Sequence, residues 1–255
     1  MVLNKWNVLI SLSAALTLGS CSNNHAARME KLRAEHENKY RTELKLQQDS
    51  LRWADSVLVE ITPVINDMIE KGNFEFVKNE FDEYGRFVTK GADDTDSHKA
   101  CYLYAVVTEF GQTQLISKYH GNVAFGHTHV VLEGGDGTVC RSKIVPTSLE
   151  GANYRFENQG IYHDIVTFAN DNELLAYIDM HRDDSKLCCV QYNDYGKQLR
   201  FIPTKQEQEQ ISDAYRLGCA LALQLHCSQM SKVSADKITL LKSKLDALNK
   251  KDNNL

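Results

Sequence analysis

The spacing of hydrophobic residues divides the chain into three parts. From Arg28 to about Ile61, hydrophobic residues recur every three or four positions among Glu, Lys, Arg and Gln, without glycine or proline. This is the period of an α-helix, and it predicts a coiled-coil-like seam. The seam consists of Leu44, Gln47, Leu51, Ala54, Leu58, Ile61, Ile65 and Met68. Pro63 interrupts this part, so we expect a kink or a short second helix, and the helical segment 28–72 ends near Gly72.

Between residues 73 and 203 the period changes to two, which predicts β-strands. Runs of β-formers, among them Leu174 to Asp179, are separated by turn sequences. One of these is Glu133 to Gly137, whose Gly-Gly and Asp-Gly pairs favour a tight reversal. About eight to ten short strands at this spacing predict an antiparallel β-sandwich or open barrel. Strands and helices do not alternate, so a nucleotide-binding α/β domain is not expected.

Helical spacing returns in residues 204–250. Thr204 and Glu207 have the spacing of a capping box, and the helix they begin is expected to reach about Met230. We expect Ser234 to cap a last helix with a second seam, formed by Ile238, Leu241, Leu245 and Leu248. The C-terminal helices are predicted to pack on the N-terminal helix, with the β domain inserted between them, which makes an α+β fold. The same seams could instead pair between two chains.

The first residues have the pattern of an export signal. Lys5 precedes an uncharged, mostly apolar run from Val8 to Leu18, and Gly19 and Ser20 lead to Cys21. An apolar run of about 7 to 15 residues is typical of a cleaved signal, whereas a membrane span needs about 20. Leu18-Gly19-Ser20-Cys21 resembles the lipobox of bacterial lipoproteins. The resemblance implies that 1–20 is a signal peptide and that Cys21 is acylated; the alternative is an ordinary secretory signal followed by chance by a cysteine.

The resemblance to a lipobox also implies a location in the cell envelope. Several acyl chains would hold residues 21–27 at a membrane as a lipidated tether. Ser22-Asn23-Asn24 lacks the Asp that marks inner-membrane retention in enteric bacteria, which favours the outer membrane. It also lacks the acidic cluster that often marks surface export, so the periplasmic and the exposed face both stay open. In outline the chain resembles uncharacterised small lipoproteins of Bacteroidota-type bacteria, and no activity comes with that resemblance.

The net charge restricts the possible partners of the chain, and the cysteine count restricts its possible disulfides. The net charge of −5 becomes −6 when residues 1–20, which contain Lys5 and no acid, are removed, and this argues against nucleic-acid binding. Six cysteines follow Cys21, and an even number in an exported protein permits disulfides. Free thiols buried as small hydrophobes are the favoured interpretation, and the alternative is a structural disulfide, for which Cys101 with Cys140 is the most plausible pair. The six are Cys101, Cys140, Cys188, Cys189, Cys219 and Cys227.

Candidate chemistry is sparse. His127 and His129 are two apart, which on a regular strand puts both imidazoles on one face, where they could bind a metal. His120, His163 or His181 would have to supply a third ligand. Residues 91–97 resemble a calcium loop but lack its central glycine and closing glutamate. Aromatic residues of the β domain could form a sugar- or peptide-binding face; they include Tyr84, Tyr102, Tyr104, Tyr154, Tyr192 and Tyr195.

These observations predict a lipid-anchored protein of the cell envelope that binds or scaffolds without catalysis and without a cofactor. Its expected partners are the membrane, through Cys21, and an envelope protein or a glycan. The alternative is a metal-assisted envelope hydrolase that uses His127 and His129.

Overall fold

The computed structural model describes residues 5–78, 80, 83–90 and 99–250, with side chains from His25 onward. The chain forms two compact units. Unit 1 combines Met1–Ser56 with Ser228–Leu255, and unit 2 is Val57–Cys227. Two long helices contribute to both units: α1 (Lys5–Lys71) and α3 (Lys205–Lys250). Within the described side chains, we find no helix that is long and apolar enough to cross a membrane.

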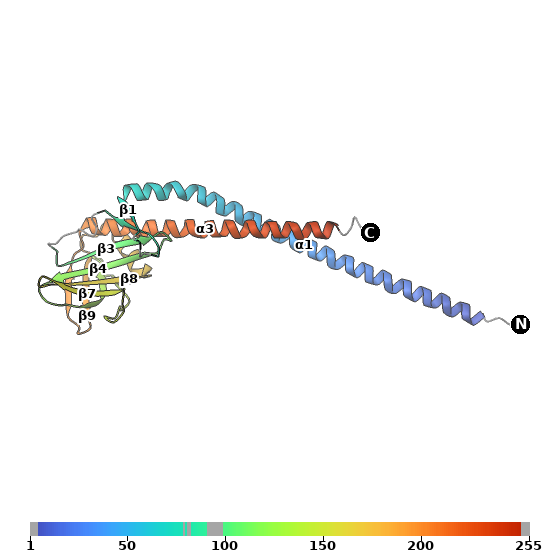
Figure 1. Ribbon diagram of the computed structural model, residues 1–255, viewed down its shortest axis with the longest axis horizontal. Coiled ribbons are helices and arrows are strands. Elements are labelled where there is room, and N and C mark those ends of the chain that lie inside the picture. The colour runs from blue at the N-terminus through green and yellow to red at the C-terminus, as the bar shows by residue number, and fades with distance from the viewer. Residues whose placement is uncertain (1–4, 79, 81–82, 91–98, 251–255) are drawn as a thin grey trace. The chain divides into compact units, whose positions relative to one another are not determined.

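Unit 2 has two antiparallel sheets, which confirms the predicted α+β class (Figure 1). Sheet A has six strands in the order β1-β2-β3-β4-β8-β7, and sheet B has four in the order β10-β9-β5-β6. The strands of sheet A are β1 (Phe74–Val77), β2 (Arg86–Thr89), β3 (Cys101–Thr108), β4 (Thr113–Gly121), β7 (Asn153–Asn158) and β8 (Ile161–Ala169). Those of sheet B are β5 (His127–Glu133), β6 (Val139–Arg141), β9 (Cys188–Asn193) and β10 (Gln198–Phe201).

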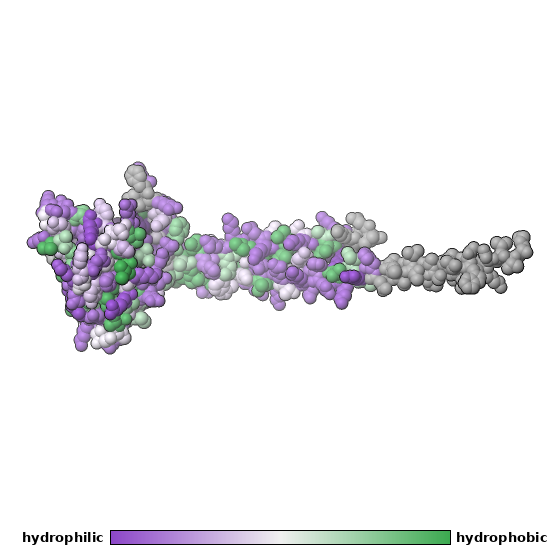
Figure 2. Space-filling view, turned by 90° about the horizontal axis from the view of Figure 1, so that it is seen from below, coloured by the Kyte–Doolittle hydropathy of each residue, from purple (hydrophilic) through white to green (hydrophobic). Residues whose placement is uncertain are grey.

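The core of unit 2 lies between the sheets and extends under the helices. Alternate residues of each strand point into it, as the period of two predicts. Sheet A contributes Leu103, Val107, Leu115, Val166 and Phe168, and sheet B contributes Val130, Leu132 and Cys189. Ile211, Ala214, Leu217 and Leu221 of α3 join the same cluster. The face of the molecule seen in Figure 2 is largely hydrophilic with scattered hydrophobic side chains.

The segment predicted as a strand from Leu174 to Asp179 is instead helix α2 (Asn172–Met180). Leu174, Leu175 and Ile178 are completely or almost completely buried. Positions i, i+1 and i+4 share one side of a helix but not one face of a strand, so this spacing fits the helix better. The prediction was wrong because it gave more weight to the β-formers than to this spacing.

The helices α1 and α3 are longer than predicted. Pro63 lies inside α1, so the helix neither ends nor restarts there. The backbone of residues 22–27, the predicted tether, also belongs to α1. Ser234 does not begin a new helix: it is buried within α3, because position 234 continues the seam of Ile238, Leu241 and Leu245.

Unit 1 is a helix pair formed by the two ends of the chain. The predicted seams are its less exposed positions, and Ala54, Ile238, Leu241 and Leu245 are buried. Polar contacts join the helices as well: the Ser231 hydroxyl donates to Asp55 at 2.8 Å, and the Lys244 ammonium lies 5.4 Å from the Tyr40 ring centre. The contacts pair residues of rising number with residues of falling number, so the two helices are antiparallel.

Candidate functional site

His127 and His129, the two histidines considered as candidate metal ligands, lie on opposite faces of sheet B. The register between β5 and β9 shifts between them: His127 pairs with Asn193, whereas His129 pairs with Tyr192. Paired residues share a face and consecutive residues do not, so the shift separates the two imidazoles. The prediction of a shared face was wrong because it assumed a strand without a bulge.

His127 points into the protein. Its exposed fraction is 0%, and neither ring nitrogen has a hydrogen-bond partner. The Phe125 ring stacks on it with a centroid distance of 6.3 Å. Burial lowers the pKa of His127 to about 3, against a smaller opposing effect of the Ser117 backbone. The imidazole is therefore neutral at physiological pH and closed off from solvent ligands.

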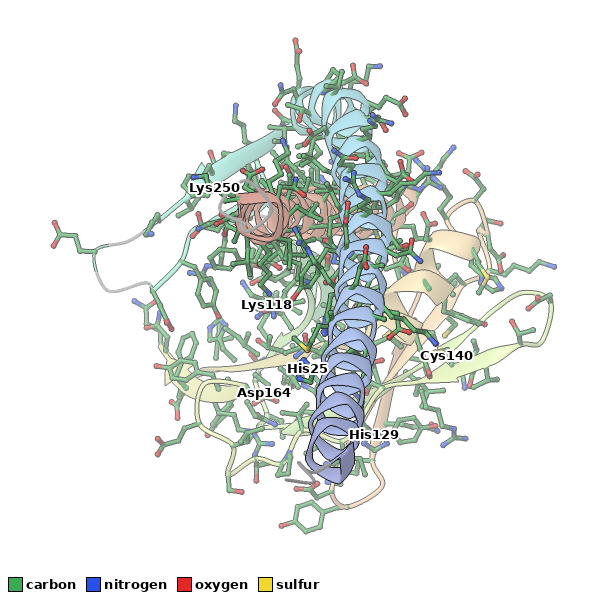
Figure 3. The ribbon with its side chains drawn as sticks, turned by 90° about the vertical axis from the view of Figure 1, so that its right-hand side faces the viewer. His25, Lys118, His129, Cys140, Asp164 and Lys250 are labelled. Carbon is green, nitrogen blue, oxygen red and sulfur yellow. The ribbon has the colours of Figure 1, made fainter. Side chains whose placement is uncertain are left out.

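His129 lies against an aromatic ring on the other face. Its ring is nearly parallel to that of Tyr192, with centroids 5.0 Å apart. The Thr128 hydroxyl is 3.3 Å from Nδ1 of His129, and burial lowers the pKa of this imidazole too. Across the described side chains, no three His, Cys, Asp or Glu residues are placed to hold one metal ion. His127 and His129 therefore do not face one ion together; Figure 3 labels His129 among the side chains of the β domain.

The other three histidines considered as ligands lie elsewhere. His120 of β4 and His163 of β8 are paired with each other in sheet A. His181, at the end of α2, stacks on Tyr177 with centroids 4.2 Å apart and lies 3.5 Å from a carboxylate oxygen of Asp136. None of the three joins His127 or His129.

The glycine-rich turn at residues 133–137 reverses the chain between β5 and β6, as predicted. The Gly134 N–H donates to the Tyr177 hydroxyl at 2.8 Å, and that hydroxyl donates to the Thr138 carbonyl at 2.8 Å. The Thr138 hydroxyl contacts Asp136 at 2.6 Å, and the Gly135 N–H donates to Asp184 at 2.6 Å. These contacts anchor the hairpin to α2 and to the turn after it, and no local sequence pattern predicted this polar cluster.

All six described cysteines are free thiols, so the disulfide between Cys101 and Cys140 is not formed. Cys101 lies on β3 of sheet A and Cys140 on β6 of sheet B, and these strands are not neighbours. Burial raises the pKa of Cys101 to about 11, which keeps the thiol protonated and weakly nucleophilic. Cys189 and Cys227 are buried as predicted, whereas Cys219 is exposed.

A cleft of about 410 Å³ opens beside β10, at an edge of sheet B. Its apolar lining comes from Leu199, Phe201 and Cys101, and its polar groups include Lys99, Arg200 and Glu207. Glu207 is buried: one carboxylate oxygen accepts from the Thr204 N–H at 2.6 Å and completes the predicted capping box. The other oxygen lies 3.4 Å from the Lys99 ammonium and pairs with it. The cleft therefore combines apolar walls with two cationic groups and a buried, paired carboxylate.

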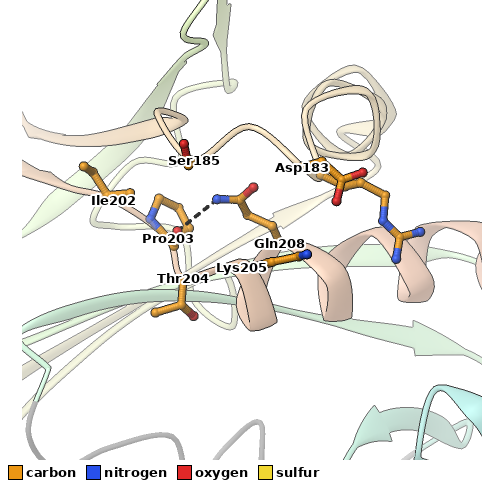
Figure 4. A pocket seen from close by; sticks show the side chains of 8 residues that line it. Asp183, Ser185, Ile202, Pro203, Thr204, Lys205 and Gln208 are labelled. Atoms are coloured by element: carbon orange, nitrogen blue, oxygen red, sulfur yellow. Dashed lines mark hydrogen bonds between the residues drawn. The ribbon is translucent and has the colours of Figure 1, made fainter.

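A second hollow, of about 270 Å³, lies on another side of the same helix start (Figure 4). Asp183, Ser185, Thr204 and Lys205 line it, and the amide of Gln208 donates to the Pro203 carbonyl at 2.9 Å. Charges of both signs face this hollow, so it has no clear preference for an anion or a cation. We regard the cleft beside β10 as the better candidate for a ligand.

Several tyrosines considered as a binding face do share one face of sheet A. The pairing of β3, β4, β8 and β7 puts Tyr102 and Tyr154 in one row across the sheet, on the side away from the core. Tyr102 and Tyr104 are largely buried, with the Lys118 ammonium over both rings, whereas Tyr154 is 60% exposed. Tyr192 belongs to sheet B and Tyr195 to the turn after it, so these two are not part of the face.

The calcium-like loop considered in the sequence and the predicted acylation site lie outside the described part of the structure. Residues 91–98, which contain the calcium-like loop, are not described, and neither is the side chain of Cys21. Acylation of Cys21 therefore stays a prediction. In comparisons with known proteins, no family model, no curated protein and no solved structure matches the chain.

Proposed function

We propose that this chain is a lipid-anchored protein of the cell envelope that binds a partner or ligand through its β domain. The support for the anchor is the leader, in which an apolar run from Val8 to Leu18 is followed by Gly19, Ser20 and Cys21. An acylated Cys21 would be the first residue of the mature chain and would precede the helix pair of unit 1. In this proposal the destination is the outer membrane.

The observation that most favours a binding role is the cleft beside β10. Leu199 and Phe201 offer apolar contacts. Lys99 and Arg200 bring cationic groups to the same cleft, where Lys99 also pairs with the buried Glu207 carboxylate at 3.4 Å. Binding sites are typically apolar hollows with a few placed polar groups. The ligand class that fits is a small molecule or side chain with an apolar body and an anionic or hydrogen-bond-accepting group for Lys99 or Arg200. The metal-assisted hydrolase is less favoured, because its two histidines lie on opposite faces of β5.

The anchor is tested by intact mass and membrane fractionation of the protein from cells, with Cys21→Ala as the comparison. We expect wild-type protein of acylated mass in the outer-membrane fraction, and a variant that is neither acylated nor membrane-bound. An unmodified Cys21 in the wild type would contradict the proposal. Protease treatment of intact cells then distinguishes the two faces: cleavage indicates the exposed face and protection the periplasmic one.

The binding role is tested separately by photo-crosslinking in cells. A photoreactive amino acid replaces Leu199, which lines the cleft, and in the control it replaces Tyr195, whose side chain is 90% exposed in the turn before β10. We expect a discrete adduct at position 199 that is absent at position 195. The same adducts at both positions, or none at 199, would contradict a ligand in the cleft.

A further inference from the structure

His120 and His163 form a close pair on the face of sheet A that points away from the core. They are directly opposite each other in the register of β4 and β8. The His120 N–H donates to the Ala100 carbonyl at 2.8 Å, on the side of β3. His120 thus makes its ladder bonds to that side, and its pair with His163 is of the non-hydrogen-bonded kind. Side chains come closest in such pairs.

The distance between the two rings is close to that of two imidazoles on one ion. Their centroids are 6.1 Å apart with an angle of 41° between the planes. Two imidazoles on one metal have metal–nitrogen distances of about 2.0–2.1 Å, which puts their centroids about 5–6 Å apart. A small movement of either side chain therefore brings one nitrogen of each ring to the same ion.

The neighbouring Phe156 holds one ring without using its nitrogens. It stacks on His163 with centroids 4.6 Å apart and an angle of 8°. This contact covers a face of the imidazole and leaves its edge open. Neither His120 nor His163 is completely buried, and no hydrogen bond to their ring nitrogens is formed by the side chains and backbone that the structure describes.

The protonation state also suits a ligand. Burial, and to a smaller extent the neighbouring His163, lowers the pKa of His120. A neutral imidazole binds metal, whereas a protonated one does not. The lowered pKa of His120 thus agrees with metal binding, which is inferred from the distance between the two rings.

We propose that His120 and His163 form a two-imidazole site for a divalent transition-metal ion. Imidazole suits Cu²⁺, Ni²⁺ and Zn²⁺, and the order of affinities for divalent ions puts Cu²⁺ first. No group of three or more ligating side chains occurs in the described residues, so the described part of the chain supplies two ligands. Water or a group from outside the chain fills the other positions, and the bound metal can exchange and accept a further ligand.

The test uses the full-length protein in detergent, without a histidine tag, and Ni²⁺ as the probe because it does not oxidise thiols. Binding is measured by isothermal titration calorimetry for the wild type, His120→Gln, His163→Gln and the double variant. We expect each single change to weaken Ni²⁺ binding at least tenfold. The double variant should bind Ni²⁺ at least as weakly as either single variant. His129→Gln is the matched control, since His129 lies on sheet B. This variant should bind Ni²⁺ with the affinity of the wild type.

A second readout locates the ion. Diethylpyrocarbonate modifies accessible neutral imidazoles, and mass spectrometry identifies the modified residues. We expect Ni²⁺ to protect His120 and His163 together, and to leave the modification of His129 unchanged. The proposal is overturned if the double variant binds Ni²⁺ with wild-type affinity, or if Ni²⁺ protects neither histidine. Circular dichroism verifies the fold of each variant, and a misfolded Gln variant is replaced by the corresponding Asn variant.

Discussion

Gly111 and Gly218 lie against each other at the contact between the β3–β4 turn and α3. A Cβ on Gly218 would lie 3.0 Å from the Gly111 carbonyl oxygen and 2.0 Å from the Thr113 hydroxyl oxygen. A Cβ on Gly111 would lie 2.3 Å from the Ala222 nitrogen, and Gly111 has a φ of +82°. The turn therefore packs on the helix backbone only because both residues lack a side chain.

Gly111→Ala is expected to destabilise unit 2 by about 2–4 kcal/mol, because backbone strain and overpacking add. Gly160→Ala is the matched control: Gly160 has a φ of +79°, but nothing lies within 4 Å of its Cβ position. The control should cost about 1–2 kcal/mol, from the conformation alone. Urea unfolding measures both, and equal losses would show that the contact with α3 is unimportant.

The buried His127 should make stability depend on pH. The unfolded chain binds a proton at His127 below about pH 6.5, whereas the folded protein does not until about pH 3. Stability therefore falls as the pH is lowered through this window, by up to about 1.4 kcal/mol per pH unit.

The contribution of His127 is isolated by comparison with His127→Leu. The variant should lose less stability than the wild type between pH 6.5 and pH 4.5 in urea unfolding. Burial raises the pKa of Asp164, an effect with the opposite sign, but Asp164 is present in both proteins and cancels in the difference. Parallel pH profiles would mean that His127 is protonated in the folded protein.

Tyr177→Phe is expected to destabilise unit 2 by about 0.5–1.5 kcal/mol. The change removes the hydroxyl bonded to the Gly134 N–H and to the Thr138 carbonyl, while these two groups stay bonded to each other at 2.9 Å. Tyr154→Phe should change stability by less than about 0.5 kcal/mol, because Tyr154 is exposed. Hydrogen exchange of the 133–138 turn provides a local readout. Faster exchange is expected in Tyr177→Phe alone, and an unchanged rate would show that the Tyr177 hydroxyl does not stabilise the turn.

Two neighbouring leucines test the helix pair of unit 1. Leu241 is 3% exposed and Leu240 is 54% exposed. Leu241→Ala should cost about 2–4 kcal/mol of the stability of unit 1, and Leu240→Ala less than about 0.5 kcal/mol. Hydrogen exchange over residues 228–250 measures the difference, and similar exchange in both variants would contradict the seam.

Elements whose signal lies in nearby residues could be predicted. The seam through Leu51 and Ala54 is a repeat of three and four, and the turn at 133–137 requires glycines that the sequence contains. The capping box of Thr204 and Glu207 is likewise local, and its two groups do meet. In each case the interacting residues are separated by a few positions, so the backbone geometry of one element decides the contact.

The candidate sites could not be predicted, because they depend on how strands are paired. The bulge beside Thr128 places His127 and His129 on opposite faces of the sheet. No residue type in this stretch predicts the bulge. His120 and His163 are 43 positions apart in the chain and become neighbours only through the register of β4 with β8.

The sequence by itself determined the helical seams and the strand-rich middle, since each rests on a local period or composition; the export leader stays a prediction. The tertiary structure alone decided which histidines meet, which thiols are buried and where Glu207 faces a cleft. The physical reason is that a shift of one residue in strand register reverses the face of every later side chain. The hydrophobic period alone does not specify that shift. Which polar side chains become neighbours on the surface therefore depends on how the strands pair.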